Sequence, residues 1–320
     1  MSQNQKTPEK VDVSVVIPVH NEAKNIPIIF SKLQAALKKS GQSYEIIFVD
    51  DGSTDLSLKN MLALKNGSAQ PKVVHFKKNK GKSAALSAGF RHAAGDKIAT
   101  IDADYQEPPE EIPRMSACLE NGYDLISGWR HSRQDPWIKV LSSKVFNWLV
   151  RQVAHTPLHD VNCGLKIYKK EVAKNIDLHG ELHRVIPILA ERKGFRVGEV
   201  KVAHRAREHG STKFRGILRG FHGIFDLFTV LFLSSYKERP LHFFGMAGCV
   251  LFLFGLGINL FLSFRYFLGV GYIGERLPLF MLGILSMIMG FQSFCLGLVG
   301  EMLAGRRLAE TKDTDEKIYE

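Results

Sequence analysis

Residues 13–55 read VSVVIPVHNEAKNIPIIFSKLQAALKKSGQSYEIIFVDDGSTD. The runs at 13–18 and 44–50 are short and rich in Val and Ile, as buried strands are, and a helical pattern at 23–39 separates them. The alternation continues with strand-like runs at 72–76 and 97–102 and with helical patterns at 55–65 and 82–93. Such alternation predicts an α/β, Rossmann-like domain with a mostly parallel sheet that is covered on both faces.

Polar residues follow three of these strand-like runs directly. His20, Asn21 and Glu22 come after the first run, residues 50–53 close the second, and residues 102–104 close the fourth. Ligands of open α/β sheets bind at the carboxyl ends of the strands. We therefore expect the three clusters to form one site.

The residues around these clusters exclude two common nucleotide-binding motifs. Gly81-Lys82-Ser83 could end a Walker loop, but Phe76 stands where that motif needs its first glycine. The turn at 20–23 reads HNEA, without the glycines of a dinucleotide fingerprint. The sequence therefore favours neither an ATPase nor a dehydrogenase.

Asp102 and Asp104 form a candidate metal site at the end of a predicted strand. Mg²⁺ and Mn²⁺ prefer oxygen ligands and often bridge one or two carboxylates to substrate phosphates. A solvated acidic turn is the alternative, since short acidic patterns are common. The position after a strand, together with the second acidic cluster at 50–51, favours the metal site.

Two apolar segments near the C-terminus predict a transmembrane helical hairpin. Residues 241–264 and 277–300 contain no Asp, Glu, Lys or Arg. About 20 apolar residues cross a bilayer as a helix, so both segments are long enough. Helices buried in a soluble core are the alternative, but such helices normally carry a polar stripe, which neither segment shows convincingly.

Basic residues lie on one side of this hairpin. Lys237, Arg239, Arg306 and Arg307 flank it, together with more basic residues upstream, whereas the connecting loop holds few. The positive-inside rule then places both termini and the soluble domain in the cytosol, and predicts an integral protein of the cytoplasmic (inner) membrane. The segment 214–239 mixes apolar and basic residues and is expected to lie in the headgroup layer as amphipathic helices, or else to pack on the domain as a linker.

The bulk composition agrees with a cytosolic domain that meets anionic partners. The formal net charge is +11, which suggests nucleic acid, anionic lipids or phosphorylated substrates. Nucleic acid is disfavoured because the basic residues are not interleaved with aromatic ones. The four cysteines form no CxxC pair, and the polar tail at 1–12 lacks the apolar core of a signal peptide.

Four motifs resemble those of family 2 glycosyltransferases, which have the GT-A fold. VSVVIPVHNE at 13–22 resembles their opening strand, and VDDGSTD at 49–55 resembles the signature that holds base and ribose. NKGK at 79–82 resembles the next loop, and DADYQEPP at 102–109 resembles the metal motif. The family more often has Asp where this chain has Glu107, and we expect little consequence because that side chain need not touch the metal.

The resemblance extends to the polyprenyl-phosphate branch of this family, which includes dolichyl-phosphate mannose synthases and bactoprenol glucosyltransferases. DVNCG at 160–164 and HRAREHGSTKF at 204–214 are similar to motifs of that branch. The resemblance implies inverting, metal-dependent transfer of a hexose from a UDP- or GDP-linked sugar to undecaprenyl or dolichyl phosphate. The implied organisation is a tail at 1–12, a catalytic domain at 13–213, juxtamembrane helices at 214–239, a hairpin at 240–302 and a cytosolic tail at 303–320.

The resemblance also implies a set of site residues. Those expected to hold the nucleotide sugar are Pro18, His20, Asn21, Glu22, Asp50, Asp51, Ser53, Lys82, Asp102, Ala103 and Asp104. Those expected to hold the Mg²⁺ or Mn²⁺ ion are Asp102, Asp104 and, as a further candidate, Gln106. Asp160 matches an acceptor-side carboxylate that could act as a base or orient basic residues.

A lipid phosphate acceptor explains the basic residues near the predicted site. A phosphate monoester is mostly ionised at neutral pH, so it needs cationic groups to hold it rather than a base to activate it. The candidates are Arg130, Arg133, Lys139, Arg205, Arg207 and Lys213. Arg130, Arg207 and Lys213 are expected to act in catalysis with Asp102, Asp104 and Asp160, and a basic surface facing anionic lipids is the alternative.

Two other functions remain open from the sequence. A glycosyltransferase that acts on a hydroxyl acceptor in polysaccharide synthesis would normally have more spans and a Gln-x-x-Arg-Trp-type motif, which this chain lacks. A catalytically inactive membrane scaffold is disfavoured by the intact acidic pairs. The predicted partners are thus a nucleotide sugar, a polyprenyl phosphate and membrane lipids, and the hairpin could also support a homo-oligomer.

Overall fold

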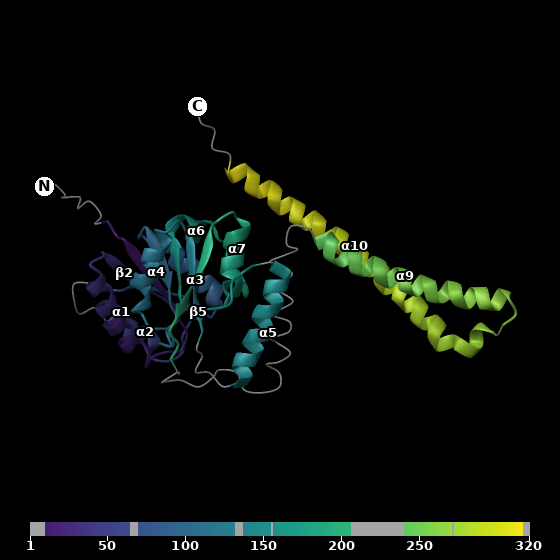
Figure 1. The fold of residues 1–320 in the computed structure, drawn as a ribbon, viewed down its shortest axis with the longest axis horizontal. Helices are drawn as coiled ribbons and strands as arrows, with labels where there is room; N and C mark the ends of the chain where they lie inside the picture. Colours follow the sequence, from purple (N-terminus) through teal and green to yellow (C-terminus); the bar gives the residue numbers. More distant parts are fainter. Residues whose placement is uncertain are drawn as a thin grey trace, which may run out of the picture. The chain divides into compact units, whose positions relative to one another are not determined.

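The computed structural model describes residues 10–64, 70–131, 137–154, 156–205, 240–270 and 272–315. The chain divides into two compact units, Met1–Ser234 and Ser235–Glu320. The first unit is an α/β domain and the second contains the two long apolar helices, as Figure 1 shows. The predicted segment 214–239 lies outside the described residues.

A seven-stranded sheet in the order β3-β2-β1-β4-β6-β5-β7 forms the centre of the first unit. Its strands are β1 (Val13–Val19), β2 (Tyr44–Asp50), β3 (Lys72–His75), β4 (Lys97–Thr100), β5 (Leu125–Arg130), β6 (Lys166–Lys169) and β7 (Val197–Val202). Strand β6 runs antiparallel to both its neighbours, and the other pairs are parallel. The prediction of a mostly parallel sheet is therefore confirmed, with one reversed strand in its interior.

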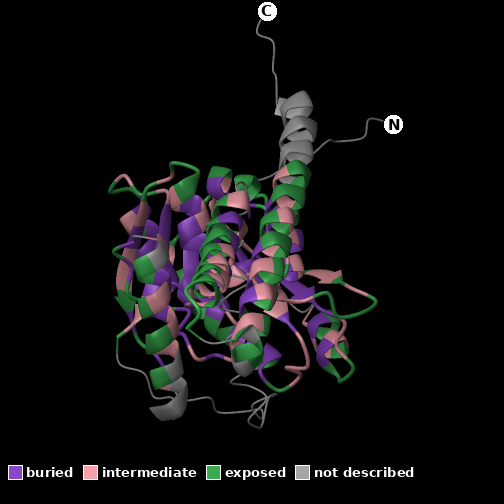
Figure 2. Ribbon diagram, turned by 90° about the vertical axis from the view of Figure 1, so that its right-hand side faces the viewer, coloured by how far each residue is buried: buried purple, intermediate pink, exposed green. Residues whose placement is uncertain are grey.

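Helices cover both faces of this sheet because both faces of its central strands are apolar. The helices are α1 (Ile26–Ser40), α2 (Ser57–Ala63), α3 (Lys82–His92), α4 (Glu111–Leu119), α5 (Trp137–Ala154), α6 (Lys170–Asn175), the 3-10 turn η1 (Leu182–Val185) and α7 (Ile186–Arg192). Val15 and Ile17 pack with α1 and α4, whereas Val16 packs with α3 and α6. Figure 2 shows the buried residues concentrated in this interior.

The strand and helix bounds differ from the expected ones mainly at their ends. Helix α1 starts at Ile26 rather than Ala23, with Pro27 in its first turn, where the missing amide hydrogen costs nothing. Strand β4 leaves the ladder after Thr100, so Asp102 lies in the loop beyond it. Strand β5 ends at Arg130, which therefore lies on the strand itself.

The second unit is a pair of helices, α9 (Pro240–Phe267) and α10 (Leu277–Asp315), joined through the 3-10 turn η2 (Ile273–Arg276). The segments Pro240–Phe267 and Leu277–Leu303 have mean hydropathies of 2.1 and 1.9 and are long enough to cross a membrane. Only 17% of each hydropathic window is buried, which is unlike the core helices of soluble proteins. These two helices are candidate transmembrane helices, as the sequence predicts.

Glycines allow α9 and α10 to approach closely. A Cβ atom added at Gly290 would lie 2.6 Å from the carbonyl oxygen of Gly248, and Gly248 is equally restricted by Gly290. Ser293 nearby donates a hydrogen bond of 2.9 Å from Oγ to the Phe244 carbonyl. Small residues that let backbones pack closely are typical of helix pairs in membranes.

We expect Gly290→Leu to destabilise this hairpin, because the added side chain would force the two backbones apart at a cost of roughly 1–3 kcal/mol or more. The measurement is the apparent melting temperature and the monodisperse fraction of the full-length protein in detergent. Gly257→Leu is the matched control, since nothing lies within 4 Å of a Cβ atom at Gly257. Equal behaviour of the two variants would contradict the close packing.

Candidate functional site

An open pocket lies where β1, β2 and β4 end. About 520 Å³ of empty space, partly open to solvent, is lined by Pro18, Val19, His20, Glu22, Asp51, Lys82, Asp102, Ala103 and Asp104. Most residues expected to hold a nucleotide sugar are thus brought together from loops far apart in the sequence. Asn21, Asp50 and Ser53 are the expected residues that do not line the pocket.

Those three residues hold the loops of the pocket in place. Asp50 is fully buried, and its two carboxylate oxygens accept hydrogen bonds from the Ser53 amide at 3.1 Å and from His75 Nδ1 at 2.8 Å. The backbone amide of Asn21 donates to Ser53 Oγ at 3.0 Å. The side-chain oxygen Oδ1 of Asn21 accepts from the backbone amide of Thr54 at 2.8 Å. Asn21 and Ser53 thus connect the loop after β1 to the loop after β2, and Asp50 connects the loop after β2 to β3.

Asp51 joins the second loop to the third. Its carboxylate accepts hydrogen bonds from the amides of Lys80 at 2.7 Å and Gly81 at 3.0 Å. Gly52 has φ +65°, and a Cβ atom there would lie 2.5 Å from the Asn79 amide nitrogen, so only glycine permits this approach. Lys82 follows directly and points its side chain toward the acidic pair.

The acidic pair and Lys82 form the charged wall of the pocket. Lys82 Nζ lies 2.5 Å from Asp102 Oδ1. Desolvation opposes both charges, but the attraction within the pair outweighs it, so the pKa of Asp102 lies below its ordinary value and that of Lys82 above. Gly164 leaves room for this carboxylate, since a Cβ atom there would lie 2.6 Å from Asp102 Oδ2.

The donor set fits a cation that is shared with a substrate. Among the residues that the structure describes, no group of three or more His, Cys, Asp or Glu side chains could hold a metal ion. Asp102 and Asp104 nevertheless line one pocket, and two carboxylates completed by substrate phosphates are a common Mg²⁺ environment. Gln106 does not line the pocket, and its amide nitrogen lies 3.5 Å from the Arg205 carbonyl.

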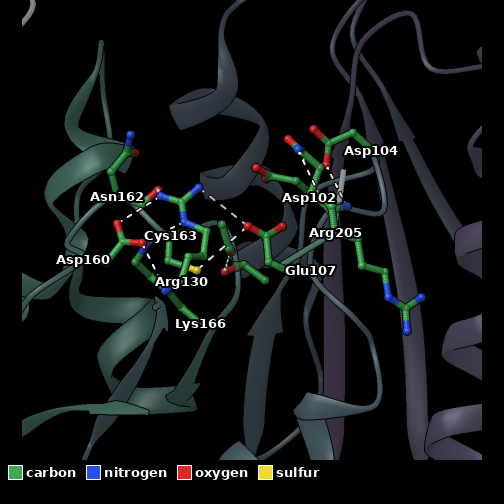
Figure 3. Close-up of polar contacts among 12 residues, drawn as sticks. Asp102, Asp104, Glu107, Arg130, Asp160, Asn162, Cys163, Lys166 and Arg205 are labelled. Carbon is green, nitrogen blue, oxygen red and sulfur yellow. Dashed lines mark hydrogen bonds and ion pairs between the residues drawn. The ribbon is translucent and has the colours of Figure 1, made fainter. Parts of the chain in front are cut away.

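A second cluster of charged residues is buried beside this wall, and Arg130 is at its centre (Figure 3). Arg130 Nε lies 2.7 Å from Asp160 Oδ2 and Arg130 Nη2 lies 3.0 Å from Asp160 Oδ1, which is a bidentate pair. Arg130 Nη2 also donates to the Asn162 carbonyl at 3.2 Å. Both oxygens of Asp160 contact Arg130, which favours the orienting role over that of a base.

In the sequence, Glu107 stood out only as a departure from the family pattern, and it was not expected in a buried charged cluster. It is 2% exposed, and its Oε1 atom lies 3.8 Å from Arg130 Nη1. Burial, and then the charge of Asp102, raise the pKa of Glu107 to about 7. The departure from the family's Asp at this position was the only signal that the sequence offered.

Lys166 is a further buried cation that the sequence did not single out. It is 3% exposed and donates to the Cys163 carbonyl. Burial lowers the pKa of Lys166 to about 8. The strand pattern of its neighbours gave no sign of this position, because a lysine in a short strand normally faces solvent.

The residues expected to hold the acceptor phosphate are only partly placed. The guanidinium of Arg205 donates a hydrogen bond to the Tyr105 hydroxyl, and its Cζ atom lies 5.0 Å from the centroid of the Tyr105 ring. In Figure 3 this side chain extends away from Arg130. Arg133, Arg207 and Lys213 lie outside the described residues, as does the side chain of Lys139 on α5. The structure therefore does not bring Arg130 and Arg205 into one cationic group.

His183 on η1 anchors this turn to the start of α3. Its Nδ1 atom lies 3.1 Å from Ser83 Oγ, and its amide donates to the same oxygen at 3.1 Å. Burial, and then the positive charges of Lys82 and Arg184, lower the pKa of His183 to about 2. His183 therefore stays neutral in the folded protein at pH values where a histidine in the unfolded chain takes up a proton.

This difference predicts a pH dependence of stability. Below an ordinary histidine pKa of about 6.5, the unfolded chain binds a proton that the folded chain does not, so stability is lost as the pH falls. When the pH falls from about 7.5 to about 5.5, the free energy of unfolding should decrease for wild type. For His183→Asn this decrease should be smaller by about 1 kcal/mol. The apparent melting temperature at both pH values measures this, and His92→Asn, at an exposed histidine, should keep the wild-type dependence.

Comparison with known proteins agrees with this fold and site. Residues 14–177 match the family model described as glycosyl transferase family 2. A dodecaprenyl-phosphate galacturonate synthase from Rhizobium johnstonii is 37% identical, over 92% of this chain and 88% of its own length. An undecaprenyl-phosphate 4-deoxy-4-formamido-L-arabinose transferase from Pectobacterium atrosepticum is 34% identical, over 91% of this chain and 88% of its own length.

Solved structures of similar fold are more distant in sequence. Glucosyl-3-phosphoglycerate synthase from Mycobacterium tuberculosis, crystallised with Mn²⁺ and uridine-diphosphate-glucose, has a TM-score of 0.55 at 18% identity, over 70% of this chain and 79% of that one. Mannosyl-3-phosphoglycerate synthase from Rubrobacter xylanophilus has a TM-score of 0.56 at 17% identity, over 71% of this chain and 75% of that one. These two structures support the GT-A-like fold, and the matches in sequence show the lineage: the chain belongs to glycosyl transferase family 2 and is a glycosyltransferase.

Proposed function

We propose that this enzyme transfers a sugar from a nucleotide sugar to a polyprenyl phosphate at the cytosolic face of the inner membrane. The observation that carries the proposal is the pocket in which the segments after β2, β3 and β4 place Asp51, Lys82, Asp102 and Asp104 together. Both relatives described above are named for transfer to a polyprenyl phosphate, and the similarity covers 88% of each. The two candidate transmembrane helices would keep the enzyme where such a lipid resides.

The donor would lie across the pocket. Of the residues that line it, His20 and Asp51 are proposed to contact the nucleoside, and Lys82, Asp102 and Asp104 the diphosphate. A Mg²⁺ or Mn²⁺ ion held by Asp102 and Asp104 would supply positive charge for the departing diphosphate. Lys82 adds a positive charge on the same wall.

The acceptor phosphate needs no base, because at neutral pH it is already mostly ionised. It would attack the anomeric carbon from the face opposite the departing nucleotide, which inverts the configuration at that carbon. Arg130, oriented by Asp160, is the described residue proposed to hold this phosphate. Arg133, Lys139, Arg205, Arg207 and Lys213 remain candidates for the same task.

The test is to incubate the purified full-length protein with undecaprenyl phosphate and a panel of UDP- and GDP-linked sugars that includes uronic acids and formamido sugars. We expect one donor to give a lipid whose mass equals polyprenyl phosphate plus the sugar, with the opposite anomeric configuration from the donor. Undecaprenol, which has the same chain but a hydroxyl end, should give no product. Transfer to undecaprenol instead, or no product with any donor, would contradict the proposal.

A further inference from the structure

We propose that Lys82 competes with the divalent cation for Asp102 and leaves this carboxylate when the diphosphate of the donor binds. This inference rests on the proposed function, because it takes the donor and the cation from it. Its consequence is that the empty pocket binds a divalent cation weakly, whereas cation and nucleotide strengthen each other's binding. Lys82 would then be a positioning residue that sets the dependence of metal binding on the donor.

The geometry places the ammonium group where it blocks a metal ligand. Lys82 Nζ lies 2.5 Å from Asp102 Oδ1, and Lys82, Asp102 and Asp104 line the same pocket. A divalent cation bound to Asp102 and Asp104 would stand close to this ammonium group, and the two positive charges would repel each other. A cation that binds Asp102 Oδ1 in the absence of donor would therefore displace Lys82.

The contact between Lys82 and Asp102 is able to open. The two side chains are 34% and 31% exposed, so neither is locked in the protein interior. Lysine carries a compact charge on a flexible stem and can follow an anion over a few ångströms. The diphosphate of a donor in this pocket would offer Lys82 a replacement anion, and Asp102 would regain both oxygens for the cation.

The donor would also complete the cation site. Asp102 and Asp104 are its two carboxylates on the pocket wall, and phosphate oxygens are the usual additional ligands of such ions. Two effects of the diphosphate thus act in the same direction, because it supplies ligands and removes a competing cation. By linkage, the factor by which nucleotide strengthens cation binding equals the factor by which the cation strengthens nucleotide binding.

The other cation near Asp102 is held differently. Lys166 is buried and donates to the Cys163 carbonyl, and it forms no ion pair with a carboxylate among the residues that the structure describes. Lys166 therefore keeps a positive charge near Asp102 after Lys82 is replaced. The competition is assigned to Lys82 because its ammonium group contacts the carboxylate directly.

The experiment measures Mn²⁺ binding by calorimetry to the full-length protein in detergent, without nucleotide and with UDP or GDP. We expect Lys82→Met to bind Mn²⁺ without nucleotide at least about tenfold more tightly than wild type, and to lose most of the tightening caused by the nucleotide. Lys82→Arg should stay close to wild type in this measurement, because it keeps the positive charge. Lys80→Met, at an exposed lysine two positions away, should behave as wild type.

Two further measurements make the result specific. Adding Asp104→Asn to Lys82→Met should abolish the tight Mn²⁺ binding, which places the ion at this pocket. Lys82→Gln serves as the second variant if Lys82→Met does not fold, as judged by its melting curve. Equal or weaker Mn²⁺ binding by the folded Lys82 variant would overturn the proposal, as would tight nucleotide-independent binding by wild type.

These measurements need neither acceptor nor transfer. Failure of the competition would leave a polyprenyl-phosphate-sugar product unaffected, and the proposed function would stand. Conversely, transfer to a different acceptor would disprove the proposed function while the Mn²⁺ result stood. The two hypotheses can therefore fail separately.

Discussion

Asp104→Asn is expected to reduce sugar transfer by about 1,000-fold, because a bound cation contributes several kcal/mol of charge stabilisation at the departing diphosphate. Asn is nearly the same size as Asp but lacks the negative charge. Asp104 is only partly buried at the pocket wall, so the melting temperature should change little. The measurements are the rate of lipid product formation and the melting curve of the same preparation.

Asp104 is a better position for this test than Asp102. Neutralising Asp102 would also remove the ion-pair partner of Lys82 and mix two effects. Glu110→Gln is the matched control, since it removes one negative charge at an exposed position just before α4. Wild-type transfer by Asp104→Asn in the presence of a chelator would show that the acidic pair does not hold a required cation.

Arg130→Met should cause the largest loss of stability, because it removes the guanidinium that forms a bidentate ion pair with the buried Asp160. Breaking a buried ion pair by removing one member costs about 3–5 kcal/mol, which for a domain of this size lowers the melting temperature by roughly 6–20 °C. Asp160 is 2% exposed, so water cannot replace the guanidinium. The measurement is the apparent melting temperature in detergent.

Two companion variants separate charge from geometry. Arg130→Lys keeps the charge but cannot form the bidentate pair with Asp160. Its melting temperature should therefore lie between those of Arg130→Met and wild type. Arg114→Met, at a 53% exposed side chain paired with Glu111, should cost about 1 kcal/mol or less. An unchanged melting temperature for Arg130→Met would refute the importance of the buried cluster.

The local sequence pattern was sufficient to predict the strands and loops that form the pocket. The run at 44–50 is the strand Tyr44–Asp50, and each of the polar clusters after β1, β2 and β4 contributes residues to one pocket. Short-range rules explain the strand, since runs of Val and Ile bounded by polar residues form buried strands. The shared pocket follows because parallel strands end at the same edge of the sheet. The two apolar segments near the C-terminus were equally evident from their length and composition.

Pairings between distant residues were decided by the tertiary structure alone. Strand β6 lies antiparallel between β4 and β5, and this placement brings Asp160 to Arg130 across thirty positions of sequence. The same arrangement of elements places Glu107 near Arg130 and brings Lys82 into contact with Asp102. The physical reason is that periodicity reports which face of an element is apolar, whereas the partner of a buried charge depends on which elements become neighbours.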